Sequence, residues 1–189
     1  MITSNFINTI RSMKHSPVDN YAGIPGLTSW LVGAGIKANH GGTRLFACDR
    51  THQEPIVPHS HRYDLHCIVL CGSVVNITWK PCVATQGDRF MKSVLACSGM
   101  GHYKTADEGT GFYRPERKEY KEGDEYLIDH KEIHSIFFSR GTEVLVFESA
   151  PRSNQSFILE PHVNDETIRT FQVQPWAFQP RKEDNNYGG

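Results

Sequence analysis

Three histidines in this sequence could meet at one metal ion. His59 and His61 belong to the stretch VPHSHRYDLHCIVLCG, and His134 belongs to DHKEIHSIFFSRG. Side chains alternate along an extended strand, so His59 and His61 project from the same face and can reach one ion. His134 opens a predicted strand after a turn and is the best candidate for a third ligand, ahead of His130 in that turn. Three neutral imidazoles suit Fe(II), Ni, Zn, Mn or Cu and leave coordination positions open for substrate or oxygen.

The first of these segments resembles the first motif of the cupin superfamily. That motif has an HxH pair, then a glutamate, then a glycine, and here His59, His61 and Gly72 match it. Counting back from Gly72 places Leu65 at the glutamate position, whereas counting forward from His61 places His66 there. Neither residue is a carboxylate, so the resemblance implies a site without the usual glutamate.

The second cupin motif is matched by Gly123 and His134, which have the required separation. The resemblance covers approximately Thr43 to Pro151. It implies a small β-barrel with a metal at its mouth, bound by His59, His61 and His134. Such a ligand set adds no charge, so the ion keeps its full positive charge and favours an anionic or chelating substrate.

Three-histidine sites of this kind occur in the cupin-type thiol dioxygenases and diketone-cleaving dioxygenases, which bind Fe(II). The same segment is also similar to small cupins with an HxHPWDF-like sequence, with Asp64 at the Asp position and Leu65 at the Phe position. This register puts Leu65 and Cys67 on one face and His66 on the other. It disfavours His66 as a ligand, although His66 and Asp64 stay open as a fourth ligand or a hydrogen-bonding partner.

Other polar residues near the predicted site have three candidate roles. Guanidinium and phenol groups could bind an anionic substrate, a phenol or carboxyl group could act as acid or base, and thiols could face the barrel interior. These residues are Arg44, Arg62 and Tyr63 for anion binding, Tyr126 and Glu148 as acid or base, and Cys67 and Cys71 as interior thiols. Surface or packing roles compete with each of these.

The elements expected to position the site are mostly strands. Short β-rich runs separated by turn residues begin at Thr43, which predicts an all-β fold, here a double-stranded β-helix or jelly-roll barrel. Helical spacing predicts one short helix over 4–13 and a second over 27–37. We therefore predict an N-terminal extension with short helices at 1–42, a cupin barrel at 43–176 and a flexible tail at 177–189.

The segment Cys97–Glu122 contains four glycines and many charges, and it resembles a loop or hairpin inserted between two core strands. Such insertions often border a pocket. We expect it to lie beside the ligand site.

The composition of the 189 residues, with a net charge of −1, indicates neither disorder nor nonspecific nucleic-acid binding. The five cysteines include no CxxC pair, and we expect free thiols. No apolar stretch reaches the length of a membrane span, and no secretory signal is seen. We predict a cytoplasmic homodimer that binds a small molecule.

These features predict a mononuclear Fe(II) oxygenase acting on a small anionic or chelating metabolite, with Zn, Ni or Mn as alternative metals. A second hypothesis is a non-catalytic cupin that binds a ligand or partner, with a structural or absent metal. A third is a metal-independent sugar-nucleotide epimerase on the same barrel. Fold alone does not decide among them, because one fold hosts many functions.

Overall fold

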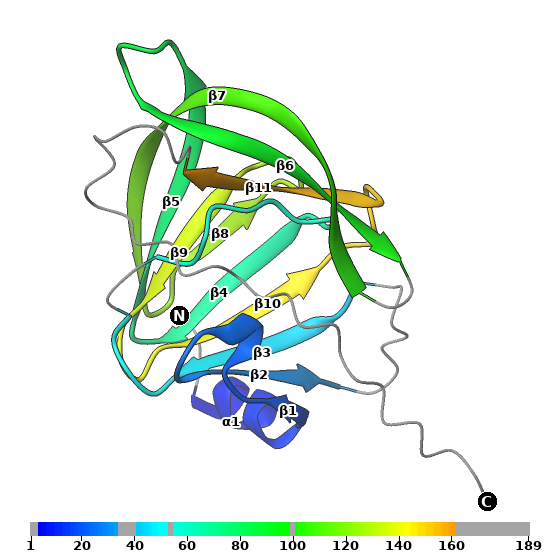
Figure 1. Ribbon diagram of the computed structural model, residues 1–189. Coiled ribbons are helices and arrows are strands. Elements are labelled where there is room, and N and C mark those ends of the chain that lie inside the picture. The colour runs from blue at the N-terminus through cyan, green and yellow to red at the C-terminus, as the bar shows by residue number, and fades with distance from the viewer. Residues whose placement is uncertain (1–3, 34–40, 53–54, 99–100, 162–189) are drawn as a thin grey trace, which may run out of the picture.

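The structure is a computed structural model that describes residues 4–33, 41–52, 55–98 and 101–161 (Figure 1). Its elements are mostly antiparallel strands. In chain order they are α1 (Ser4–Ser12), β1 (Lys14–Val18), the 3-10 turn η1 (Tyr21–Gly23), β2 (Leu27–Val32), β3 (Thr43–Cys48), β4 (Leu65–Cys71), β5 (Ser73–Cys82), β6 (Asp88–Ser98), β7 (Gly101–Lys121), β8 (Glu125–Ile128), β9 (His134–Phe138), β10 (Glu143–Glu148) and β11 (Gln155–Pro161).

The strands form two sheets that face each other around the core (Figure 1). The first, sheet A, has the order β1-β2-β3-β10-β4-β8, and the second, sheet B, has the order β11-β6-β7-β5-β9. Period-2 alternation sends one set of side chains from each strand into the space between the sheets. Leu65, Cys67 and Val69 of β4 belong to this interior cluster. The predicted all-β, jelly-roll architecture is confirmed.

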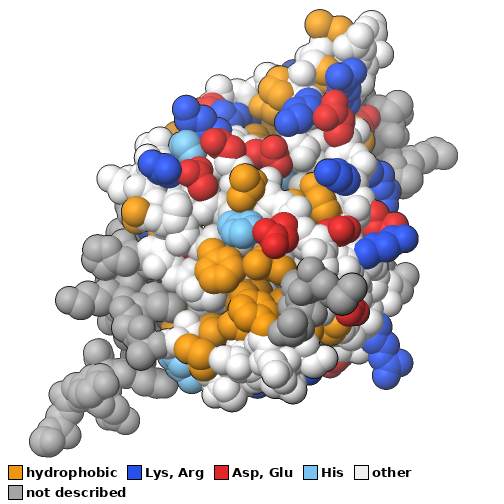
Figure 2. Space-filling model, turned by 180° about the vertical axis from the view of Figure 1, so that it is seen from behind, with side chains coloured by type: hydrophobic (Ala, Val, Ile, Leu, Met, Phe, Trp, Pro, Cys, Tyr) orange, Lys and Arg blue, Asp and Glu red, His pale blue; other side chains and the backbone are white. Residues whose placement is uncertain are grey.

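Sheet A is buried on its outer face as well. Ile68 and Leu70 of β4 point outward, where they pack with Leu145 of β10 and Ile10 of α1. Helix α1 therefore covers part of this face. Because side chains on both faces of β4 are packed, its run CIVLC is apolar without alternation. Lysine, arginine and acidic side chains are interspersed over the face of the molecule shown in Figure 2, so no single-sign patch dominates it.

Sheet B is closed by the segment that carries the HxH pair. His59 makes isolated bridges to His134 on β9 and to Ile158 on β11, and these are the two edge strands of the sheet. Two further backbone bonds, from Leu159 N to Pro58 O and from Ser60 N to Phe157 O, extend the contact with β11. The segment thus pairs both exposed edges at once, which removes unpaired backbone groups and closes the barrel.

The prediction of a second helix over 27–37 is wrong. Residues Leu27–Val32 form β2, which pairs with β3 from Leu27 opposite Cys48 to Leu31 opposite Arg44. The pairing satisfies backbone groups along β2, whereas a short helix ending in glycines would be marginal alone. Apart from the turn η1, α1 is the one helix among the described residues.

The expectation of an inserted loop at Cys97–Glu122 is also wrong, whereas the alternative of a hairpin is partly right, because β7 pairs antiparallel with the preceding strand β6. Most of this segment is β7, which pairs with β5 on one side and β6 on the other. Gly109, with φ of 112°, lies beside a β-bulge, so this glycine bends a long strand rather than marking a loop. None of residues 106–121, whose side chains are described, lines the central cavity.

The predicted domain limits stay a prediction, and residues 162–176 and the tail 177–189 lie outside the described residues. The cytoplasmic location, the homodimer and the lack of nucleic-acid binding also stay predictions. No helix in the described part of the chain has the length and apolarity needed to cross a bilayer. The four cysteines whose side chains are described are free, as expected.

Candidate metal centre

The structure brings His59, His61 and His134 together in one compact triangle. The ring centroids of the three pairs are 4.8, 5.0 and 5.1 Å apart. The Nε2 atoms of His61 and His134 are 2.9 Å apart. Each histidine offers a nitrogen within 4.8 Å of the other two, so the group could hold a metal ion.

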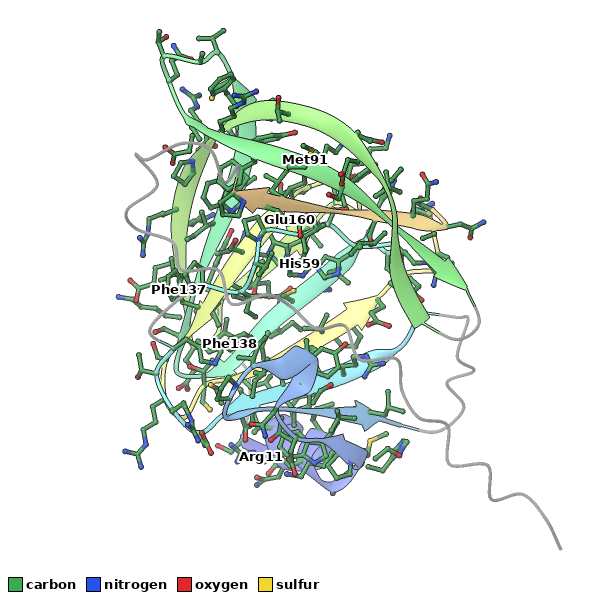
Figure 3. All side chains as sticks on the ribbon, in the orientation of Figure 1. Arg11, His59, Met91, Phe137, Phe138 and Glu160 are labelled. Carbon is green, nitrogen blue, oxygen red and sulfur yellow. The ribbon has the colours of Figure 1, made fainter. Side chains whose placement is uncertain are left out.

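Backbone pairing produces this proximity. His59 N donates to His134 O at 2.9 Å, and His134 N donates to His59 O at 2.8 Å. These reciprocal bonds place the two residues directly opposite each other, and His61 follows on the same side two residues later. Figure 3 shows His59 in the interior between the sheets. The HxH spacing therefore brings three histidines together only because β9 starts at His134, opposite His59.

Two of the histidines are oriented by oxygen acceptors behind them. Nδ1 of His59 donates to the carbonyl oxygen of Val57 at 2.7 Å. Nδ1 of His134 donates to Oδ1 of Asn76 at 2.6 Å. With the proton held on Nδ1, Nε2 of each ring carries the lone pair that a metal requires. Asn76 was not found from the sequence, although an asparagine inside the strand-like run VVNITW was a usable signal because strands are poor in asparagine.

Replacing Asn76 by valine is expected to lower the metal affinity of the site by about 10–100-fold, because the His134 ring loses the acceptor that orients it. Asn76→Asp keeps an oxygen acceptor and is expected to retain more of the affinity. Competition titration with a colorimetric chelator measures both variants. A folded Asn76→Val protein with unchanged affinity would show that Asn76 does not orient the ligand.

Burial keeps His59 and His134 neutral. Desolvation lowers the pKa of His134 well below 6.5, and the neighbouring His59 and His61 lower it further. Desolvation also lowers the pKa of His59, although the bond to Val57 opposes this. Neutral imidazole is the ligating form, so both rings are ready for a cation at neutral pH.

The metal-free protein is expected to lose stability as the pH falls below 6.5. In the unfolded chain these histidines take up protons near that pH, whereas His59 and His134 stay neutral in the folded chain. The unfolded state then binds more protons, so the free energy of unfolding is fully present above pH 6.5 and declines below it, by at most about 1.4 kcal/mol per pH unit for each histidine. Urea unfolding above and below pH 6.5 measures the slope. His134→Gln should reduce it, and an identical slope would contradict the assignment.

The donor set fits a divalent metal. Two nitrogens about 2.1 Å from one ion and at right angles to each other lie about 3 Å apart, close to the spacing of the His61 and His134 nitrogens. Neutral nitrogen donors suit Fe(II), Zn, Ni and Mn alike, so the geometry does not choose among them. The two sheets and the histidine triangle between them match the arrangement that the sequence resemblance implied. The chain therefore has the predicted two-sheet β-barrel with a candidate three-histidine metal site.

Comparison with known proteins gives distant similarities in structure. No family model matches the sequence, and no curated protein matches it. The chain is similar to the hydroxypropylphosphonic acid epoxidase from S. wedmorenis, with 8% identity and a TM-score of 0.45, over 72% of this chain and 56% of the epoxidase. It is also similar to KdgF from Halomonas sp., with 16% identity and a TM-score of 0.39, over 74% of this chain and 90% of KdgF. A third similar structure is an RmlC-like cupin from Shewanella frigidimarina, with 16% identity and a TM-score of 0.36, over 68% of this chain and 79% of that cupin. The chain spans little more than half of the epoxidase, and likenesses this distant carry no conclusion about activity.

No carboxylate joins the triangle among the described residues. Leu65 occupies the place expected for glutamate, is 7% exposed and lines the cavity of the barrel. His66 lies on the opposite face of β4, as the Gly72 register predicted, and its Nε2 is 2.9 Å from Oε2 of Glu125. Because its side chain is 41% exposed and paired there, His66 does not reach the triangle.

Asp64 and His130 form a separate group. Oδ1 of Asp64 accepts from the backbone N and from Nδ1 of His130, each at 3.0 Å, and Oδ2 accepts from Nε of Arg152 at 2.9 Å. The bonds from His130, followed by that from Arg152, hold the pKa of the Asp64 carboxyl below its usual value. Asp64 therefore anchors the turn before β9 and does not act as a fourth ligand.

A cavity of about 260 Å³ adjoins the three histidines. Alternate residues of several strands line it, including His134, Ile136 and Phe138 of β9 and Val144 and Val146 of β10. Every second residue of β9 thus faces the cavity: the first is the candidate ligand, and the following ones form apolar wall. A concave apolar site with a few convergent polar groups is typical of small-molecule binding.

Not all of the predicted anion-binding residues line the cavity. Arg62 and Tyr63 line the cavity, whereas Arg44 does not. Nε of Arg44 is 3.2 Å from Oε1 of Glu148, a residue that does line the cavity. Each charge of this half-buried pair largely neutralises the other, so neither Arg44 nor Glu148 presents an isolated charge to a ligand.

The two candidate interior thiols differ. Cys67 lines the cavity beside Tyr126, its partner across β4 and β8. Burial raises the pKa of the Cys67 thiol to about 12, and it raises the pKa of Tyr126 well above 10, so both groups hold their protons at neutral pH. The expectation for Cys71 is wrong, because its thiol lies near Arg11 and Glu143 and donates to Gly141 O at 3.1 Å. A β-bulge just before it interrupts the alternation of β4.

Proposed function

We propose that this chain is a mononuclear Fe(II) oxygenase that acts on a small chelating molecule held in the barrel cavity. The observation that supports it is the convergence of His59, His61 and His134 on the cavity, with no carboxylate beside them in the described part of the chain. Three ligands from one side leave coordination positions for a substrate and for oxygen.

The three histidines would hold the ion, and iron would supply the activation of dioxygen. The chain's own residues provide the surroundings. Val57 and Asn76 keep Nε2 of two histidines available, and the apolar walls exclude water from the reacting molecule. Tyr126 keeps its proton because of burial, so at neutral pH its hydroxyl serves as a hydrogen-bond donor and not as a base.

The competing function is a ligand-binding module with a structural or absent metal. It is favoured by the largely apolar cavity, in which Glu148 is paired with Arg44 and Tyr126 stays protonated. Such walls offer few groups for moving protons, whereas they suit retention of a ligand.

Metal analysis and oxygen uptake separate the two functions. Protein purified without added metal is analysed for bound metals, then loaded with Fe(II) and screened against chelating metabolites in an oxygen electrode. The proposal expects about one ion per chain, and oxygen uptake that is lost in His61→Ala. A bound metal without oxygen uptake for any compound would favour the binding module. A protein that binds no Fe(II) and is unaffected by His61→Ala would overturn the metal site itself.

A further inference from the structure

We propose that the molecule bound at the three histidines carries an apolar, ring-sized body, which fills the barrel beyond them while a polar head meets the metal. This inference rests on the proposed function and specifies its substrate class. It narrows the sequence-based expectation of an anionic metabolite, because the polarity of the ligand would be confined to its head. The size, walls and charges of the cavity carry the argument.

The walls beyond the histidines are aliphatic and aromatic. On β9, Ile136 and Phe138 follow His134 at intervals of two, and Val144 and Val146 on β10 face the same space. Phe138 is 4% exposed and lies inside the barrel with His59 (Figure 3). A ligand extending from the metal along β9 and β10 therefore contacts mainly apolar surface.

An aromatic pair forms part of the cavity wall. Tyr21 and Phe46 both line the cavity, and their rings meet edge to face with centroids 5.3 Å apart. The guanidinium carbon of Arg44 lies 5.8 Å from the Tyr21 ring centroid. An edge-to-face pair of this kind offers ring faces and edges on which another ring packs favourably.

The backbone that carries Tyr21 is held in an unusual conformation. Asn20 and Ala22 have φ of 48° and 56°, and with Ser16 they are the non-glycine residues of the described chain with positive φ. Such backbone is energetically unfavourable for residues other than glycine and persists where the surrounding structure imposes it. Here the strained turn places Tyr21 and Ala22 against the cavity, so it shapes part of the wall.

Few charges are available to a ligand body. Arg62 and Glu148 are the charged residues among the described residues that line the cavity. Glu148 is paired with Arg44, and Arg62 directly follows the ligand candidate His61 and donates to Ser153 O at 3.2 Å. A polyanionic or sugar-like body would bury polar groups without partners, which is costly, whereas an apolar body would not.

Two hydroxamic acids test this inference, because they share one chelating head and differ in their bodies. Acetohydroxamic acid and benzohydroxamic acid are titrated into Co(II)-loaded protein by calorimetry, with Co(II) absorption reporting the loading. Benzohydroxamic acid is expected to bind more than tenfold tighter, since the phenyl ring buries apolar surface that the methyl group lacks. Val146→Phe, which fills the cavity, should reduce this preference. Leu127→Phe, at a site that is 76% exposed outside the cavity, should leave it unchanged.

The outcomes separate this inference from the proposed function. Equal affinity for the two hydroxamic acids in Co(II)-loaded protein would overturn the apolar body and leave the metal site intact. Failure to bind Co(II) would overturn the metal site. In that case, titration of indole into the metal-free protein tests the apolar body independently of the metal. Indole binding that Val146→Phe weakens supports it, and no indole binding overturns it. If Val146→Phe does not fold, Phe46→Leu replaces it, and the loss of the aromatic ring that contacts Tyr21 should also reduce the preference.

Discussion

Replacing His61 by alanine is expected to lower the metal affinity of the protein by about 100-fold or more. The change removes a nitrogen that lies 2.9 Å from Nε2 of His134, and losing a ligand should cost at least as much as losing a residue that orients one. Chelator competition with Co(II) or Zn(II) measures the loss. Circular dichroism reports whether the variant is folded, since His61 makes no part of the backbone bridge between His59 and His134.

His66→Ala is the matched control. It also removes a histidine from the segment Val57–Gly72, but His66 faces outward and pairs with Glu125 at 2.9 Å. An exposed pair of this kind contributes about 0–1 kcal/mol to stability, so affinity and folding should both stay near those of the unmodified protein. Equal losses of metal affinity in His61→Ala and His66→Ala would refute the assignment of the triangle.

Replacing Leu145 by alanine is expected to lower the free energy of unfolding by about 2–5 kcal/mol. Leu145 is 0% exposed and packs on the outer face of sheet A with Leu45, Leu70 and Ile10 of α1. The shortened side chain would leave a cavity between the sheet and the helix. Urea unfolding monitored by tryptophan fluorescence measures the change.

Leu127→Ala is the comparison for this second variant, because the same residue type is truncated at a site that is 76% exposed. Its effect should stay within about 0.5 kcal/mol. Similar destabilisation in both variants would mean that α1 does not pack on the sheet as the structure shows. Metal affinity should be unchanged in both, since neither residue lines the cavity.

The candidate site was partly predictable because strand periodicity is local. The HxH spacing alone put His59 and His61 on one face, which needs only the alternation within one strand. The count from Gly72 that separated Leu65 from His66 depended in addition on the resemblance to the cupin motif. The same rule failed at Cys71, where a bulge inserts a residue and reverses the faces, because a bulge depends on the partner strand β10.

Non-local pairing explains the larger errors. Residues Leu27–Val32 form a strand because β3 is available to pair with them. No feature within that short segment predicts which strand it pairs with. The glycines and charges of Cys97–Glu122 resemble a loop, yet two neighbouring strands hold most of it extended. Long-range hydrogen bonds outweigh local preferences of this size.

The sequence by itself determined an all-β chain, an HxH pair on one strand face and a third histidine at the start of another strand, since each follows from residue types and spacing. Only the tertiary structure decided that His59 pairs with His134, that Asn76 lies behind His134, and that Tyr21 and Phe46 line the same cavity. These contacts join residues far apart in the chain. Packing between the two sheets decides which of them meet.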